Sequence, residues 1–282
     1  GTLKADAFLP PQGGKPEGEL QDATFDSLIE GGNVSGGWKR LVPAGAGRPL
    51  ELRGFSLASS LPLDSARRLA GGFISPSTQR RMTEWQGRAI VNATAEAAGG
   101  GVKARINAAG QQLVAGLDGG LWRVPDVRVE AALSQGSADA GLKIEASASG
   151  SGAFDRDGAT VFAEKGAQLA VEAQLSADRS QLSLSKFDLT STLLGVETRG
   201  EIRELKTRCL ADLQGKLAID FAEVTKLLEA KGIDEVQITG RGAREFHLAA
   251  PLAGGAATVF SDGAFTGAAH VGSLKGFGLN AG

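Results

Sequence analysis

Ser183-Leu184-Ser185-Lys186 has the S-x-x-K spacing of acyl-transferring serine enzymes. That chemistry needs a helix, because only there do the serine and the lysine share one face. The motif instead includes Leu184 of an alternating Leu182/Leu184 pair, which is typical of a strand, and no K-T-G follows it. We therefore interpret the motif as a chance match.

The two histidines, His247 and His270, are the other candidates for base catalysis or metal binding. In Glu245-Phe246-His247-Leu248 the histidine shares the polar phase with Glu245, which predicts a position on a strand surface. His270 lies among alanines and glycines with no carboxylate nearby in sequence. Cys209 is the only cysteine, and two lone histidines make a poor zinc site. We expect no catalytic residues, no metal, no cofactor and no enzyme activity.

Two further patterns have only a superficial likeness to ligand-binding loops. Asp155-Arg156-Asp157-Gly158 resembles the start of a calcium loop, but the later oxygen ligands and the closing glutamate are missing, so a β-turn is expected. Gly150-Ser151-Gly152 and Gly240-Arg241-Gly242 lack the strand–loop–helix context of a phosphate-binding loop. The net charge of −2 comes from 30 basic and 32 acidic residues without a basic stripe, which argues against nucleic acid as a partner.

The dominant pattern is an alternation of apolar and polar residues, as in Gln168 to Leu175 and Gly195 to Arg203. Successive side chains of a strand point to opposite faces, so each such stretch predicts a strand with one apolar and one polar face. Turn signals separate these stretches: Gly99-Gly100-Gly101, Asp118-Gly119-Gly120, Asp157-Gly158 and Asp262-Gly263. Short links predict an antiparallel meander. The alternation changes phase between Leu52 and Phe55, so we expect a bulge at Gly54.

The strands fall into two expected segments. Residues 1–87 form an irregular N-terminal β segment that ends in two short helices, from Leu61 to Leu69 and from Ser75-Pro76-Ser77 to about Trp85. Residues 88–282 form the antiparallel β meander with one helix near 221–231, capped by Asp220 and followed by Gly232.

The composition favours an extended sheet over a compact aromatic core. The chain has 41 glycines and a similar number of alanines, beside 12 phenylalanines, three tryptophans and no tyrosine. We predict a mainly β protein built on a large, curved antiparallel sheet, as a trough or an open β-sandwich, with a few short helices. No apolar run approaches the roughly 20 residues of a membrane span. The chain starts without methionine and stops amid strand-like sequence, so we expect it to be a segment of a longer protein.

One segment suggests a family. Its elements follow in the order strand, helix, strand, strand: Leu213 to Asp220, Phe221 to Leu228, Val236 to Arg241 and Arg244 to Leu252. This order, and the Ala- and Gly-rich alternation from Arg88 to Gly282, resemble the later repeats of AsmA-like proteins of Gram-negative envelopes, relatives of TamB and chorein-type lipid bridges.

The resemblance implies a long β-trough in a periplasmic protein whose full-length form is anchored in the inner membrane by an N-terminal helix that this chain lacks. It further implies a non-enzymatic role in which the protein binds or conducts phospholipid along the trough and supports outer-membrane integrity. Other envelope proteins would be its partners. Membrane contact would come through parts of the parent protein outside this chain.

The candidate lipid-facing residues are the large aliphatic residues of the apolar phase: Leu169, Val171, Leu175, Leu182, Leu184, Val196, Ile202, Leu217, Ile219, Val236 and Ile238. The same residues also fit an ordinary covered core. The alternative function is therefore a β-rich structural or adhesion module with a closed core and no lipid role.

Overall fold

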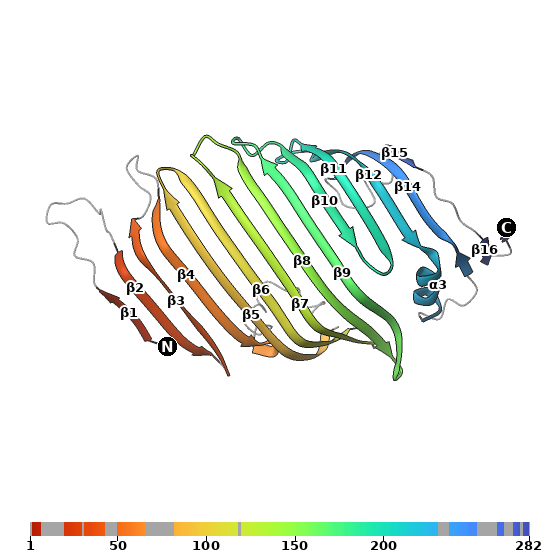
Figure 1. The fold of residues 1–282 in the computed structure, drawn as a ribbon, viewed down its shortest axis with the longest axis horizontal. Helices are drawn as coiled ribbons and strands as arrows, with labels where there is room; N and C mark the ends of the chain where they lie inside the picture. Colours follow the sequence, from red (N-terminus) through yellow and green to blue (C-terminus); the bar gives the residue numbers. More distant parts are fainter. Residues whose placement is uncertain are drawn as a thin grey trace.

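The computed structural model describes residues 2–6, 20–29, 31–42, 50–65, 82–117, 120–230, 237–252, 264–267, 273–276 and 279–281. In these residues a single open sheet dominates the molecule (Figure 1). It has 14 strands in the order β1 to β12, then β14 and β15, and every neighbouring pair is antiparallel. The prediction of a mainly β protein with a large, curved antiparallel sheet is confirmed.

Strand length divides this sheet into three regions. The N-terminal strands are β1 (Thr2–Asp6), β2 (Leu20–Ile29), β3 (Gly32–Val42) and β4 (Glu51–Pro62). The central strands are 15 to 17 residues long: β5 (Met82–Ala98), β6 (Gly101–Leu117), β7 (Gly120–Gln135), β8 (Leu142–Arg156) and β9 (Ala159–Leu175). The later strands are shorter: β10 (Leu182–Thr190), β11 (Leu194–Arg203), β12 (Leu210–Asp220), β14 (Arg241–Pro251) and β15 (Ala264–Gly267).

A second, small sheet has the order β13 (Gln237–Thr239), β16 (Ser273–Gly276) and β17 (Leu279–Ala281). The helix α3 (Phe221–Ala230) follows β12, as predicted, and its N-terminus is capped because Asp220 Oδ1 accepts a hydrogen bond from the Ala222 N–H at 3.1 Å. Only the part of β9 from Gln168 to Leu175 pairs with β10. The helix α3 contacts β9 and lies beside the lower part of that strand in Figure 1. The helix thus occupies the corner left where the strands become shorter.

Glycines shape the sheet where the sequence predicted it. Gly54 has φ +63°, and the register between β4 and β5 shifts between Leu52 and Phe55, so the expected bulge is confirmed. Gly99 and Gly100 have positive φ between β5 and β6, and Asp157 and Gly158 do so between β8 and β9. The other two turn signals lie, wholly or in part, outside the described residues.

The N-terminal helices are the main departure from expectation. Leu61 and Pro62 belong to β4, and only residues 63–65 of the first expected helix are described, as helical. The second helix was wrongly extended to Trp85, because β5 begins at Met82 and Trp85 pairs with Ala115 of β6. Pairing with the long strand β6 therefore determines the conformation of Met82 to Trp85, and the rest of the second expected helix lies outside the described residues. The expected boundary after residue 87 lies within β5, so strands of both expected segments share one sheet.

Candidate functional site: the apolar face of the sheet

One face of the sheet is apolar across its central strands. The register places side chains of this face in rows that run from strand to strand. One row crosses β5 to β10 through Ala93, Ile106, Ala131, Ala146, Val171 and Phe187. The row on one side of it contains Ala95, Ala104, Leu133, Ile144, Ala173 and Leu184, and the row on the other contains Val91, Ala108, Val129, Ala148, Leu169 and Leu189. We call these three rows, none of which includes a charged or polar residue, the apolar face.

Three large aliphatic side chains on this side of the sheet are open to solvent. Ile106 is 41% exposed, Val129 is 39% exposed, and Val102, two residues before Ala104, is 38% exposed. A side chain covered by a second layer would be almost fully buried. Among the described residues, the hydrophobic residues that are buried are alanines, and no large side chain is fully buried. The apolar face therefore presents methyl groups to its surroundings.

Nine of the predicted lipid-facing residues share this side of the sheet. The register links Leu175 of β9 to Leu182 of β10 and Ile202 of β11. It also pairs Val196 with Leu217 and Leu194 with Ile219. The remaining three of the nine belong to the rows themselves: Leu169, Val171 and Leu184.

The last two predicted residues do not join them. Val236 lies outside the described residues. Ile238 belongs to β13, where it pairs with Leu274 of β16 in the small sheet, so its assignment to the main sheet was wrong. Its strand is only three residues long and ends one residue before β14 of the main sheet, and Gly240 between the two strands has φ +113°.

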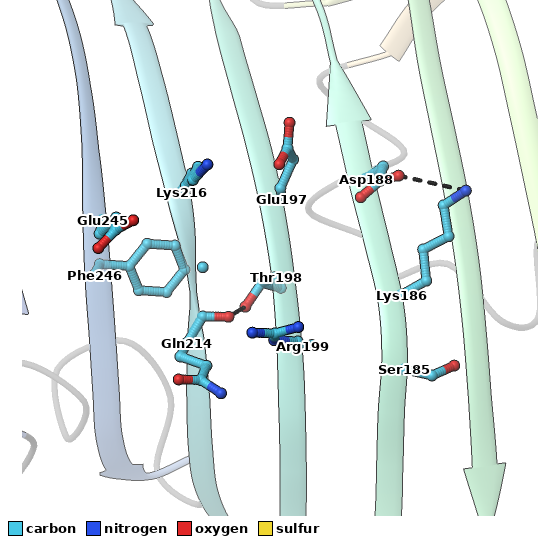
Figure 2. A pocket seen from close by; sticks show the side chains of 11 residues that line it. Ser185, Lys186, Asp188, Glu197, Thr198, Arg199, Gln214, Lys216, Glu245 and Phe246 are labelled. Carbon is cyan, nitrogen blue, oxygen red and sulfur yellow. Dashed lines mark hydrogen bonds and ion pairs between the residues drawn. The ribbon is translucent and has the colours of Figure 1, made fainter.

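The opposite face is polar. One of its rows runs from Asn92 and Asn107 through Glu130 and Ser147 to Ala170, Asp188, Glu197, Lys216 and Glu245. A shallow depression of about 430 Å³ lies on this face over β10 to β14 (Figure 2). Its walls alternate in charge: Lys186 Nζ is 3.4 Å from Asp188 Oδ2, and Glu197, Lys216 and Glu245 follow on β11, β12 and β14. This is the mixed charge of a solvated strand surface.

The S-x-x-K motif lies within β10, as expected for a strand. The register shifts there, between Leu184 and Lys186 on the β9 side. The Ser185 hydroxyl donates a hydrogen bond to the Glu172 carbonyl at 3.0 Å. The motif therefore forms a bulge, and its serine bonds to backbone.

The predicted β-turn at Asp157-Gly158 is confirmed. Just before it, Asp155 is the one buried carboxylate among the residues that the structure describes. Asp155 is 6% exposed, accepts a hydrogen bond from the Thr160 hydroxyl at 2.6 Å and forms an ion pair with Arg123. The Thr160 hydroxyl, and then Arg123, lower the pKa of Asp155 below its ordinary value. Asp155 of β8 is thus linked to β7 by the ion pair with Arg123 and to β9 by the hydrogen bond from Thr160.

His247 lies on the polar face, as predicted, with Nε2 2.7 Å from Asp212 Oδ1. Arg203 Nη2 is 3.4 Å from the other oxygen of the same carboxylate. All three side chains are at least half exposed, which is typical of a surface ion-pair network. His270 lies outside the described residues, within which no group of three or more His, Cys, Asp or Glu side chains is arranged to hold a metal ion.

The sequence did not reveal a row of aromatic residues at one end of the apolar face. Trp85, Trp122, Phe154 and Phe162 belong to four different strands, and the register aligns them with Ala115 between the two tryptophans. Ala115 and Trp122 lie equally far from the Leu117/Gly120 pair at the ends of β6 and β7, and this spacing would have given a first indication that the two are opposite each other. Phe154 and Phe162 lie three and four residues from Asp157-Gly158, and a register shift sets their pairing. We call these four residues the aromatic row.

Comparisons with protein-family models, with curated proteins and with solved structures found no match for this chain. Among the residues that the structure describes, no helix is both long and apolar enough to span a membrane.

Proposed function

We propose that this chain is a non-enzymatic lipid-binding segment that holds or conducts phospholipid, with the acyl chains lying on the apolar face. In this proposal it acts as an AsmA-like protein in the periplasm and supports the outer membrane. The observation that carries the proposal is the exposure of Ile106, Val129 and Val102 on a continuous apolar surface. Exposed apolar side chains that gather on one surface mark interaction sites in soluble proteins.

The composition of the three rows favours acyl chains over a protein partner, and the aromatic residues of β5 to β10 outside these rows are confined to the aromatic row at one end. Protein interfaces are enriched in Trp, Tyr, Phe, Met and Arg, and a few such residues dominate their binding energy. The three rows consist of Ala, Val, Ile and Leu, with Phe187 as their one aromatic residue. Such a surface offers dispersion contacts and no directional polar anchors, which suits a flexible hydrocarbon chain.

Contact with the apolar face contributes a large favourable term to lipid binding. Burying one CH₂ contributes about 0.8 kcal/mol, so ten methylenes half-covered by a single face contribute about 4 kcal/mol. Two acyl chains then contribute about 8 kcal/mol, which corresponds to roughly micromolar affinity before the cost of ordering the lipid.

Mass spectrometry of organic extracts tests the proposal. The protein would be produced in the periplasm of a Gram-negative host as wild type, as Ile106→Glu/Val129→Glu, and as Thr94→Glu/Ser149→Glu. The two variants add the same charge to opposite faces, and in the second pair the new carboxylates lie beside Arg105 and Arg128.

We expect phospholipid in the extracts of the wild type and of the Thr94/Ser149 variant, and strongly reduced phospholipid from a folded Ile106/Val129 variant. Wild-type protein without phospholipid would overturn the proposal. Unfolding of the Ile106/Val129 variant alone would instead support the alternative of a closed core, because a buried carboxylate cannot reach water.

A further inference from the structure

The apolar face differs at its two ends. At the end nearest the β6–β7 and β8–β9 turns, the aromatic row crosses β5 to β9 and contains two of the three tryptophans of the chain. At the other end of the same strands, the register aligns Ala97, Val102 and Gln135 of β5 to β7, and Leu142 with Leu175 of β8 and β9, so all but Gln135 are aliphatic. A lipid lying along the strands therefore meets two chemically different boundaries.

The aromatic row is built as a contact surface. The rings of Trp122 and Phe154 have centroids 4.9 Å apart and are tilted by 40°. The Phe154 ring lies where a Cβ of Gly120 would be, so the absence of a side chain there lets the ring approach the sheet. Trp122 remains 37% exposed. Indole rings favour positions where apolar surface meets water, because they combine a large apolar body with one N–H donor.

A positive charge follows the aromatic row at the same end. Arg156 is two residues after Phe154 in β8, and the register shift between Phe154 and Asp155 puts the extra residue in β9, so Arg156 belongs to the same face as Phe154. Its side chain is 43% exposed, and its Nε is 3.9 Å from Asp157 Oδ2, which is a long, exposed ion pair. A guanidinium has five N–H donors and can bind a phosphate oxygen while it keeps other partners.

We propose that the aromatic row marks the boundary between the tails and the headgroup of a bound phospholipid, with Arg156 binding its phosphate. This inference rests on the proposed lipid-binding function. The acyl chains then extend from Trp122 and Phe154 over Val129 and Ala148 towards the aliphatic end. The lipid therefore binds in one direction along the strands.

Fluorescence quenching tests the direction of binding. The variant Trp38→Phe/Trp85→Phe retains Trp122 as its only tryptophan. It would be loaded with phosphatidylcholine brominated either close to the glycerol ester or near the methyl end of the chains, and freed of excess lipid. We expect stronger quenching of Trp122 by the lipid brominated near the ester.

Equal quenching by the two lipids, or stronger quenching by the lipid brominated near the methyl end, would overturn the inference and leave the proposed function intact, because lipid is then bound. No quenching by either lipid, together with no lipid in an organic extract of the same sample, would overturn the proposed function itself.

A charge substitution tests the role of Arg156. We expect Arg156→Gln to weaken binding of monomeric short-chain phosphatidylcholine about tenfold, the effect of one charge-assisted contact. The matched control is Arg128→Gln, since Arg128 is exposed on the opposite face and also lies near an aspartate, Asp126. Equal affinities of the two variants would exclude Arg156 as the phosphate ligand.

Discussion

Glutamate at Ile106 distinguishes an open apolar face from a covered one. Complete burial of an isoleucine contributes about 1.5–3 kcal/mol, and Ile106 is 41% exposed, so the substitution loses roughly 1–2 kcal/mol of burial. The lower strand propensity of glutamate adds up to about 1 kcal/mol. We therefore expect Ile106→Glu to lower the free energy of unfolding by about 1–3 kcal/mol, since its carboxylate can still reach water.

Ala173, on the same face, provides the contrast. It is 6% exposed between Ile144 and Leu184, so a glutamate there has to displace its neighbours and bury part of its charge. Overpacking alone costs about 1–3 kcal/mol, and desolvation of the carboxylate adds several more. We expect Ala173→Glu to leave little folded protein.

Urea unfolding at neutral pH measures these effects. Thr94→Glu on the polar face is the surface control, and we expect it to change the free energy of unfolding by no more than about 0.5 kcal/mol. A loss for Ile106→Glu as large as that for Ala173→Glu would refute the reasoning, because it would show that Ile106 is covered.

Two further predictions concern the turns and the aromatic row. Gly120→Ala places a methyl group against the Phe154 ring and should lower the free energy of unfolding in urea by about 1–3 kcal/mol. Gly136→Ala should be nearly neutral, because no atom lies within 4 Å of the new Cβ. Equal effects of the two substitutions would contradict the packing of Phe154 on Gly120. Hydrogen bonds from two serines lower the pKa of Asp178 from 3.8 to about 2. The ionised carboxylate therefore stabilises the folded state above pH 3.8, and this contribution is lost as the pH falls towards 2. The urea midpoint of Asp178→Asn should depend less on pH in this range than that of the wild type, and parallel curves would contradict the assignment.

Much of the sheet was predictable from local sequence. The alternation in Gln168 to Leu175 correctly assigned the faces of β9, because a strand with one apolar face has only one favourable orientation. The bulge at Gly54 was also predictable, because it needs a residue that adopts a positive φ. The start of α3 was predictable because it needs a hydrogen-bond acceptor, which Asp220 provides.

The remaining features depend on pairing between distant strands. Trp85 follows a Ser-Pro-Ser helix signal, yet the long strand β6 opposite it makes it part of β5. The aromatic row depends on bulges such as the one at Gln112, where a non-glycine residue has φ +49° and no sequence signal indicates it. Ile238 alternates like the main strands, but only the order of pairing places it in the small sheet.

Site-specific photocrosslinking tests the central claim most directly. A benzophenone amino acid would replace Ile106 on the apolar face or, in a second protein, Ser149 on the polar face, and each protein would be irradiated with radiolabelled phospholipid bound. If acyl chains lie on the apolar face, position 106 forms a lipid adduct and position 149 does not. No adduct at position 106, or equal adducts at the two positions, would contradict the account.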